Sequence, residues 1–207
     1  MSRRVGTLGR SRQAAAASST LDAVLDAAQL CFARYGIAQT TVDDVVRVAK
    51  VPRATLYRHA GGKEALVEAV SLRQLDRFLA QLVEHVAGFD EFEDQIVEAV
   101  LFTIEHYRSD DLLKLVLAAG RLPEGRRLLK GMEDQLRGRL ERASKPWLEA
   151  ARQAGKLRPD VDVRDYVEWT TRVIESLVRL PPEWPRARER EFLARMLVPA
   201  FVPDAAR

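Results

Sequence analysis

The chain has 207 residues, of which 47% are hydrophobic and 30% are charged, with a formal net charge of +3 at pH 7. No apolar stretch approaches the roughly 18 residues that a membrane-spanning helix needs. The single cysteine excludes an internal disulfide and a cysteine-rich metal site. The basic N-terminus lacks the apolar segment of a signal peptide, so we expect a cytoplasmic protein with no membrane partner.

The charges are distributed unevenly along the chain. Residues 1–65 hold ten Lys and Arg but only five Asp and Glu, a net charge of +5, whereas residues 66–207 carry −2. Long runs of Ala, Leu, Arg and Glu, with few prolines and glycines, predict an all-α fold. The basic excess near the N-terminus indicates a surface that attracts an anionic partner.

The polar, basic residues 1–18 predict a mobile arm, and the first helix is expected over residues 19–35. Apolar residues recur there at helical spacing, namely Leu21, Val24, Leu25, Ala28, Phe32 and Tyr35. Cys31 falls on this apolar stripe and is expected to be a buried thiol. Gly36 follows at the position where glycine typically ends a helix.

Residues 40–66 predict two short helices joined by a tight turn and followed by a third. Thr41 is placed to cap the first short helix, with Asp44 completing a capping box. Pro52 stands where the second begins, a position that tolerates proline. That second helix is only about two turns long and buries too little to be stable alone. Its polar face therefore indicates contact with another molecule, and the spacing fits a helix-turn-helix.

Four sequence blocks in this region resemble the N-terminal domain of the TetR family of transcriptional regulators. The blocks are Phe32-Ala33-Arg34-Tyr35-Gly36, Thr40-Thr41-Val42, Thr55-Leu56-Tyr57-Arg58-His59 and Lys63-Glu64-Ala65-Leu66. The resemblance covers about residues 20–70. It implies an all-α protein of about nine helices, with a helix-turn-helix domain at 19–66 after the basic arm 1–18, and a helical ligand-binding and dimerisation domain at 67–207.

The resemblance and the side-chain chemistry together indicate which residues contact double-stranded DNA. The expected set is Thr41, Arg53, Ala54, Thr55, Tyr57, His59 and Lys63, assisted by Arg10 and Arg12 of the arm. Arg53 and Thr55 suit base edges, because arginine pairs with guanine and threonine meets the thymine methyl. For Tyr57 we expect a ring in the domain core and a hydroxyl at a phosphate, and for Lys63 a phosphate contact at a helix N-terminus.

Several residues depart from the family pattern. Lys50 replaces the usual turn glycine, so the turn must hold a lysine in or near the left-handed conformation at a cost of roughly 1 kcal/mol. Ala60 replaces a usual phenylalanine, and Gly61 and Gly62 follow it. These changes leave open a second hypothesis, a TetR-fold helical interaction protein that has lost operator binding.

The second half predicts further helices at residues 63–86, 90–107, 110–120, 124–154, 162–180 and 186–200. The resemblance implies a small-molecule effector there, and few charges among its aromatic residues would suit an apolar or aromatic compound. The candidate pocket residues are Phe78, Phe102, His106, Tyr107, Trp147 and Trp169, although an aromatic residue at helical spacing is more often an ordinary core residue.

Residues 162–180 have apolar side chains on two sides, which requires two packing partners. We therefore expect a homodimer whose interface includes Val173, Leu177, Met196 and Leu197.

An enzyme in the helical domain is a third hypothesis, and the sequence gives it little support. The three histidines are scattered, and no HxxxH pair, phosphate loop or nucleophile elbow is present. We therefore expect no catalytic residues, no metal and no cofactor. The sequence favours a ligand-responsive transcriptional regulator, specifically a repressor that binds a palindromic operator as a homodimer.

Overall fold

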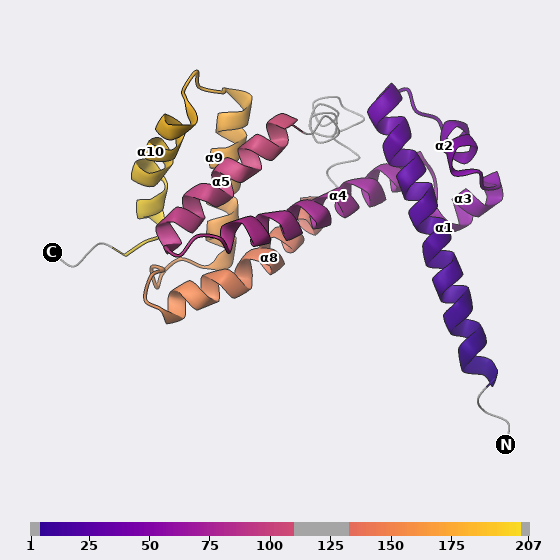
Figure 1. The fold of residues 1–207 in the computed structure, drawn as a ribbon, viewed down its shortest axis with the longest axis horizontal. Coiled ribbons are helices and arrows are strands. Elements are labelled where there is room, and N and C mark those ends of the chain that lie inside the picture. Colours follow the sequence, from indigo (N-terminus) through magenta and orange to yellow (C-terminus); the bar gives the residue numbers. More distant parts are fainter. Residues whose placement is uncertain (1–4, 110–132, 204–207) are drawn as a thin grey trace. The chain divides into compact units, whose positions relative to one another are not determined.

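The computed structural model describes the backbone over residues 5–109 and 133–203, and side chains over residues 19–109 and 134–203. The regular structure in these ranges is entirely helical, with eight α-helices and one 3-10 helix (Figure 1). The all-α prediction is therefore confirmed. The chain divides into two compact units, with the boundary inside α4 between Arg73 and Gln74.

The first unit contains α1 (Val5–Tyr35), α2 (Val42–Ala49), α3 (Arg53–Ala60) and the first part of α4 (Lys63–Val86). The prediction that the first helix begins near residue 19 was wrong, because α1 already begins at Val5. Residues 14–17 are alanines, the best helix formers, and such a run extends a helix readily. Arg10 and Arg12 therefore lie within α1 rather than in an arm that precedes it.

The core of the first unit lies where α1 packs against α2 and α3. Its buried members are Val24, Leu25, Ala27, Ala28, Cys31, Phe32, Ile37, Val45, Leu56, Ala60, Leu66, Val67 and Val70. Cys31 is buried as predicted. Leu56, the residue of α3 with no exposed surface, contributes about 1.5–3 kcal/mol by its burial. This contribution anchors a helix that is too short to be stable by itself.

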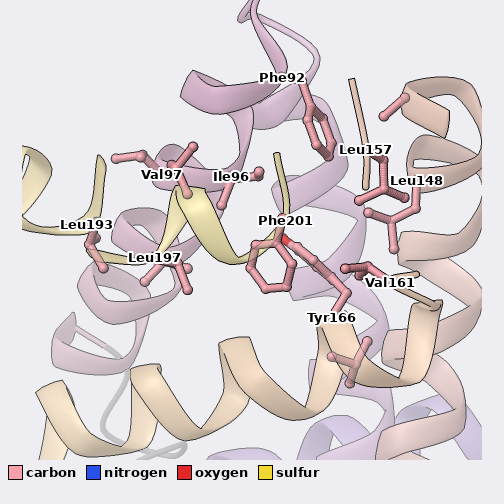
Figure 2. Packing of buried hydrophobic residues seen from close by; sticks show 14 of the residues in the cluster. Phe92, Ile96, Val97, Leu148, Leu157, Val161, Tyr166, Leu193, Leu197 and Phe201 are labelled. Atoms are coloured by element: carbon pink, nitrogen blue, oxygen red, sulfur yellow. The ribbon is translucent and has the colours of Figure 1, made fainter. Parts of the chain in front are cut away.

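The second unit contains α5 (Phe92–Ser109), α8 (Glu133–Gln153), α9 (Val163–Arg179) and α10 (Arg186–Met196), followed by the 3-10 helix Val198–Ala200. Helix α5 packs against both α9 and α10, and α8 packs against α9. Their shared core brings Phe92, Leu148, Tyr166, Leu193 and Phe201 together (Figure 2).

Two further sequence predictions are not tested by the structure, and two kinds of feature are absent from the described residues. The helix expected at residues 110–120 lies outside the described residues, and the division into three domains stays a prediction. Over residues 5–109 and 133–203, no helix is both long and apolar enough to cross a membrane. The same ranges contain no group of three His, Cys, Asp or Glu side chains placed to hold a metal ion.

Candidate nucleic-acid interface

The first helix of the helix-turn-helix, α2, begins with the predicted capping box. The Thr41 hydroxyl accepts a hydrogen bond from the Asp44 backbone N–H at 3.2 Å, and the Asp44 carboxylate accepts one from the Thr41 backbone N–H at 3.0 Å. The hydrogen bonds from Thr41, assisted by the nearby charge of Arg47, lower the pKa of Asp44. The cap fixes where α2 begins, so it also fixes the direction in which α2 leads into the turn.

The turn after α2 depends on Lys50. Its backbone has φ 55° and ψ 37°, which is the left-handed conformation predicted from the sequence. A side chain in this conformation costs free energy that glycine would not, and the folded domain holds it there. The turn therefore keeps the geometry that leads from α2 into α3.

Helix α3 turns one face into the core and another outward. Leu56 and Ala60 are buried, Thr55 and His59 are half-buried, and the remaining side chains of the helix are exposed. The exposed residues include Arg53, Ala54 and Tyr57, three of those predicted to contact DNA. A short helix with one anchored face and one polar, accessible face is the arrangement that a recognition helix needs.

Tyr57 does not occupy the place expected from the sequence. Its side chain is 44% exposed, so the prediction that its ring packs in the domain core was wrong. The ring instead lies under the Arg53 guanidinium, with 5.6 Å between the guanidinium carbon and the ring centroid. Leu56 and Ala60 already fill the core beneath α3, and this leaves the next position on the helix facing outward.

Arg53 also reaches across to the preceding helix. Its Nη1 donates to both carboxylate oxygens of Asp43, at 2.9 and 3.1 Å, and its Nη2 lies 3.4 Å from the Tyr57 hydroxyl. Sequence reasoning missed this pair. Asp43 lies ten residues before Arg53, beyond the spacing at which pairs within one helix are recognised.

The Lys63 ammonium has a partner within the protein. Its Nζ donates to the carbonyl oxygen of Ala38 at 2.7 Å, which ties the start of α4 to the loop after α1. Between α3 and α4, Gly61 has φ 72°, and its N–H donates to the carbonyl oxygen of Tyr57. A Cβ at Gly61 would lie 2.9 Å from that of Ala65. Glycine is therefore required at this helix end.

The predicted effector residues fall into separate groups in the second unit. Phe78, Phe102 and His106 form one aromatic cluster, with ring centroids 4.6 to 6.4 Å apart. Trp147 instead packs on Phe92 and Tyr166 in the core and donates a hydrogen bond to Gln95. Trp169 is 46% exposed and Tyr107 is half-buried. The structure brings together only the first three.

The predicted interface residues also differ in exposure. Leu197 is 2% exposed and belongs to the core (Figure 2), so its assignment to the interface was wrong. The chain after α10 turns through a 3-10 helix that directs Leu197 inward. Met196 is 60% exposed, while Val173 and Leu177 are half-buried against the core.

A cluster of charged side chains links α5 to α10, and sequence reasoning missed it too. Glu98 is buried and accepts hydrogen bonds from Arg186, at 3.1 Å, and from Arg190. His85 Nε2 lies 3.3 Å from the same carboxylate. Burial raises the pKa of Glu98, but the hydrogen bonds from Arg186 and His85 and the positive charges outweigh it, so the net shift is downward. The two arginines lie four residues apart on one helix face, a signal that was available in the sequence.

The fold and the exposed face of α3 define a helix-turn-helix DNA-binding protein. The pattern of the bacterial regulatory proteins of the tetR family matches residues 24–70. An HTH-type transcriptional regulator of Mycobacterium tuberculosis is 27% identical over 187 residues, which cover 89% of this chain and 87% of the relative. Residues 24–70 are thus a helix-turn-helix domain of the tetR family, and the relatives that match most of the chain are transcriptional regulators.

Solved structures share the fold. The TetR family repressor AlkX from Dietzia sp. superposes with a TM-score of 0.60 at 22% identity, covering 86% of this chain and 92% of that protein. RolR, solved in complex with resorcinol, superposes with a TM-score of 0.65 at 14% identity, covering 93% of this chain and 92% of that protein.

Proposed function

We propose that this regulator is a homodimeric, ligand-responsive repressor that binds a palindromic DNA operator through α3. The observation that carries the proposal is the outward face of α3, which presents Arg53, Ala54 and Tyr57 on a helix anchored by Leu56. A protein that acts on chromosomal DNA in this way would work in the bacterial cytoplasm. AlkX is a repressor with the same fold, which favours repression over activation.

The residues of the proposed interface divide into those that contact bases and those that contact or attract phosphates. Arg53 and Thr55 read base edges, and Ala54 allows α3 to approach the groove closely. Thr41, His59 and the Tyr57 hydroxyl contact phosphate oxygens. Lys63 supplies positive charge at the start of α4 while it holds the loop at Ala38. Arg10 and Arg12, within the first turns of α1, add further electrostatic attraction.

The alternative is a TetR-fold interaction protein that no longer binds an operator. It rests on Lys50, Ala60 and the two glycines after α3. The turn nevertheless takes its left-handed conformation with lysine, Ala60 is buried in the core, and Gly61 occupies a conformation that suits glycine. These observations favour a helix-turn-helix that can still bind DNA.

Selection from a random double-stranded DNA library tests the two hypotheses directly. The full-length chain is expected to enrich an inverted repeat whose half-site centres lie about 34–36 Å apart, or a multiple of this. The enriched duplex should then bind in a gel-shift assay with a strong dependence on salt. Failure to enrich any sequence would favour the interaction protein.

The proposed dimer uses the apolar residues that remain accessible on α9 and α10. Trp169, Val173, Leu177 and Leu180 recur at helical spacing along α9 and its C-cap, and Trp169, Leu180 and Met196 are 46%, 78% and 60% exposed. Exposed apolar residues on one helix face typically mark an interface. Leu177→Glu should give monomers in analytical ultracentrifugation, whereas the control Leu30→Glu, at an exposed leucine of α1, should remain dimeric. Wild-type monomers at micromolar concentration would contradict the proposal.

The proposed effector is a small apolar or aromatic compound that binds beside Phe78, Phe102 and His106. These rings from α4 and α5 supply faces on which an aromatic compound could stack. RolR, with the same fold, was solved with the aromatic ligand resorcinol. Because α4 contains both Phe78 and Lys63, a ligand that displaces this helix would alter DNA binding.

A panel of phenols, with resorcinol as the first probe, tests effector control. Binding is followed by the fluorescence of Trp147 and Trp169, and operator affinity is then measured with and without each compound that binds. We expect a binding compound to weaken operator affinity by about 5- to 150-fold, a typical coupling between two sites. Unchanged operator affinity at saturation would contradict induction by that compound.

A further inference from the structure

The charged pair between α2 and α3 lies on the surface proposed to meet DNA. Asp43 is the second residue of α2 and Arg53 is the first residue of α3. Both side chains are exposed, by 66% and 58%, so neither is held in place by burial. Arg53 is nevertheless constrained on two sides, by the Asp43 carboxylate at 2.9 Å and by the Tyr57 ring beneath its guanidinium.

Asp43 is not needed to cap its own helix. Thr41 and Asp44 already form the complete capping box of α2. The Asp43 carboxylate instead faces Arg53, with both of its oxygens within 3.1 Å of Nη1. An exposed carboxylate on a DNA-facing surface repels phosphates and lowers affinity for every sequence. A role for the Asp43 carboxylate on this surface must therefore be one other than an increase in DNA affinity.

The Asp43 carboxylate changes how the Arg53 guanidinium interacts with DNA. An unrestrained arginine on this surface would be drawn to any nearby phosphate, because that attraction is independent of sequence. A guanidinium whose charge is balanced by a carboxylate is attracted less. It still has N–H donors beyond those used on Asp43 and Tyr57, since arginine carries five. Those donors can form the bidentate pair with guanine that reads sequence.

We propose that Asp43 is a specificity-determining residue of the DNA interface, which positions Arg53 toward a base edge and weakens its attraction to phosphate. The proposal rests on the proposed function, because it assumes that Arg53 meets operator DNA. Asp43 acts through Arg53, so its removal should increase non-specific binding while it reduces discrimination between sequences.

The test compares Asp43→Asn with wild type on two DNA probes, the duplex selected by the wild-type chain and a scrambled duplex of equal length. Asp43→Asn keeps the side-chain shape and removes the charge. We expect affinity for the scrambled duplex to rise about 3- to 10-fold. The slope of log affinity against log salt should steepen by about 0.9 for each additional phosphate that the variant neutralises. The ratio of specific to non-specific affinity should fall about tenfold.

Two further variants separate positioning from a general change in charge. Asp22→Asn removes an exposed carboxylate from α1 and serves as the matched control, with an unchanged affinity ratio expected. In the Arg53→Ala background, Asp43→Asn should no longer change the ratio, because the residue through which it acts is absent. Thermal melting of each variant checks that the domain remains folded.

The outcomes distinguish failure of the inference from failure of the proposed function. If the wild-type chain selects no DNA sequence, the proposed function fails and the inference fails with it. A selected site that Asp43→Asn binds with the wild-type affinity ratio would overturn the inference alone. The inference also fails if Asp22→Asn produces an equal change, or if the effect of Asp43→Asn persists without Arg53.

Discussion

Arginine and carboxylate side chains meet in both units of the protein, but in opposite surroundings. The Arg53–Asp43 pair at the helix-turn-helix is exposed on both sides, whereas the side chain of Glu98, between α5 and α10, is only 4% exposed. An exposed pair contributes about 0–1 kcal/mol to stability, because water competes for both charges. A buried carboxylate without its partners is far less stable. We therefore expect the exposed pair to contribute to binding and the buried cluster to contribute to stability.

The largest expected effect comes from removal of the partners of the buried carboxylate. The double variant Arg186→Met/Arg190→Met leaves Glu98 with His85 as its remaining basic neighbour in the cluster. We expect a loss of about 3–5 kcal/mol in the free energy of unfolding, measured by urea denaturation, because a buried charge loses its compensation.

A triple variant supplies the control for this effect. Addition of Glu98→Met removes the buried charge itself and should restore most of the lost stability.

The Glu98 carboxyl of the wild type has a pKa below its ordinary value of 4.5. It therefore stabilises the fold above that pH, and this contribution is lost as the pH falls through the lowered pKa. The triple variant should lack this acid-dependent loss. A double variant within about 1 kcal/mol of wild type would show that the cluster is not structural.

At the exposed Arg53–Asp43 pair, we expect substitution to change DNA binding more than stability. Arg53→Ala is expected to lose about 1–3 kcal/mol of operator binding and to relax the preference at one base position. Its stability should change by less than about 0.5 kcal/mol, as is usual at exposed sites. Gel shifts on a set of operator variants measure the first effect and urea denaturation the second. Arg34→Ala, at an exposed arginine of α1, is the charge-matched control, and equal operator affinity for wild type and Arg53→Ala would contradict base reading.

A smaller effect is expected at the start of α2. Thr41→Ala removes the hydroxyl that caps the Asp44 N–H and should cost about 1 kcal/mol of stability. Thr41→Ser keeps the hydroxyl and should retain most of it. Chemical denaturation of both variants provides the comparison, and indistinguishable stability of the alanine and serine variants would show that the cap contributes nothing.

The smallest expected effect is a gain in stability. Lys50→Gly removes the strain of a side chain in the left-handed conformation and should stabilise the protein by about 0.5–1 kcal/mol. The gain is limited because glycine has more freedom in the unfolded chain. Lys50→Ala keeps a Cβ and should show no such gain in thermal melting. A destabilised glycine variant would mean that the lysine side chain has a contact of its own.

Local chemistry made the DNA-binding half predictable from the sequence. The capping box of Thr41 and the left-handed Lys50 each depend on residues adjacent in the chain, and both predictions are confirmed. The positions of α2 and α3 follow from the same signals. The start of α1 was misjudged because the basic composition of the N-terminal residues outweighed the helix propensity of their alanines.

Predictions that needed tertiary information were less successful. Leu197 looked like an interface residue by its spacing, but the 3-10 turn after α10 places it in the core. The two arginine partners of Glu98 lie about ninety residues away in the sequence, so spacing alone could not pair them with it. The predicted burial of the Tyr57 ring was wrong because helical spacing does not reveal which neighbouring residues already fill the core.

The buried thiol of the first unit has a practical consequence. Cys31 is 1% exposed, and burial, with a smaller contribution from the charge of Asp44, raises its pKa. The reactive thiolate is therefore scarce and inaccessible. A cysteine introduced at the exposed Ala54 would react with a maleimide spin label while the native thiol stays intact. One substitution would thus place a label on α3 of each subunit of the proposed dimer, and the distance between the two labels would report how far apart the two α3 helices lie.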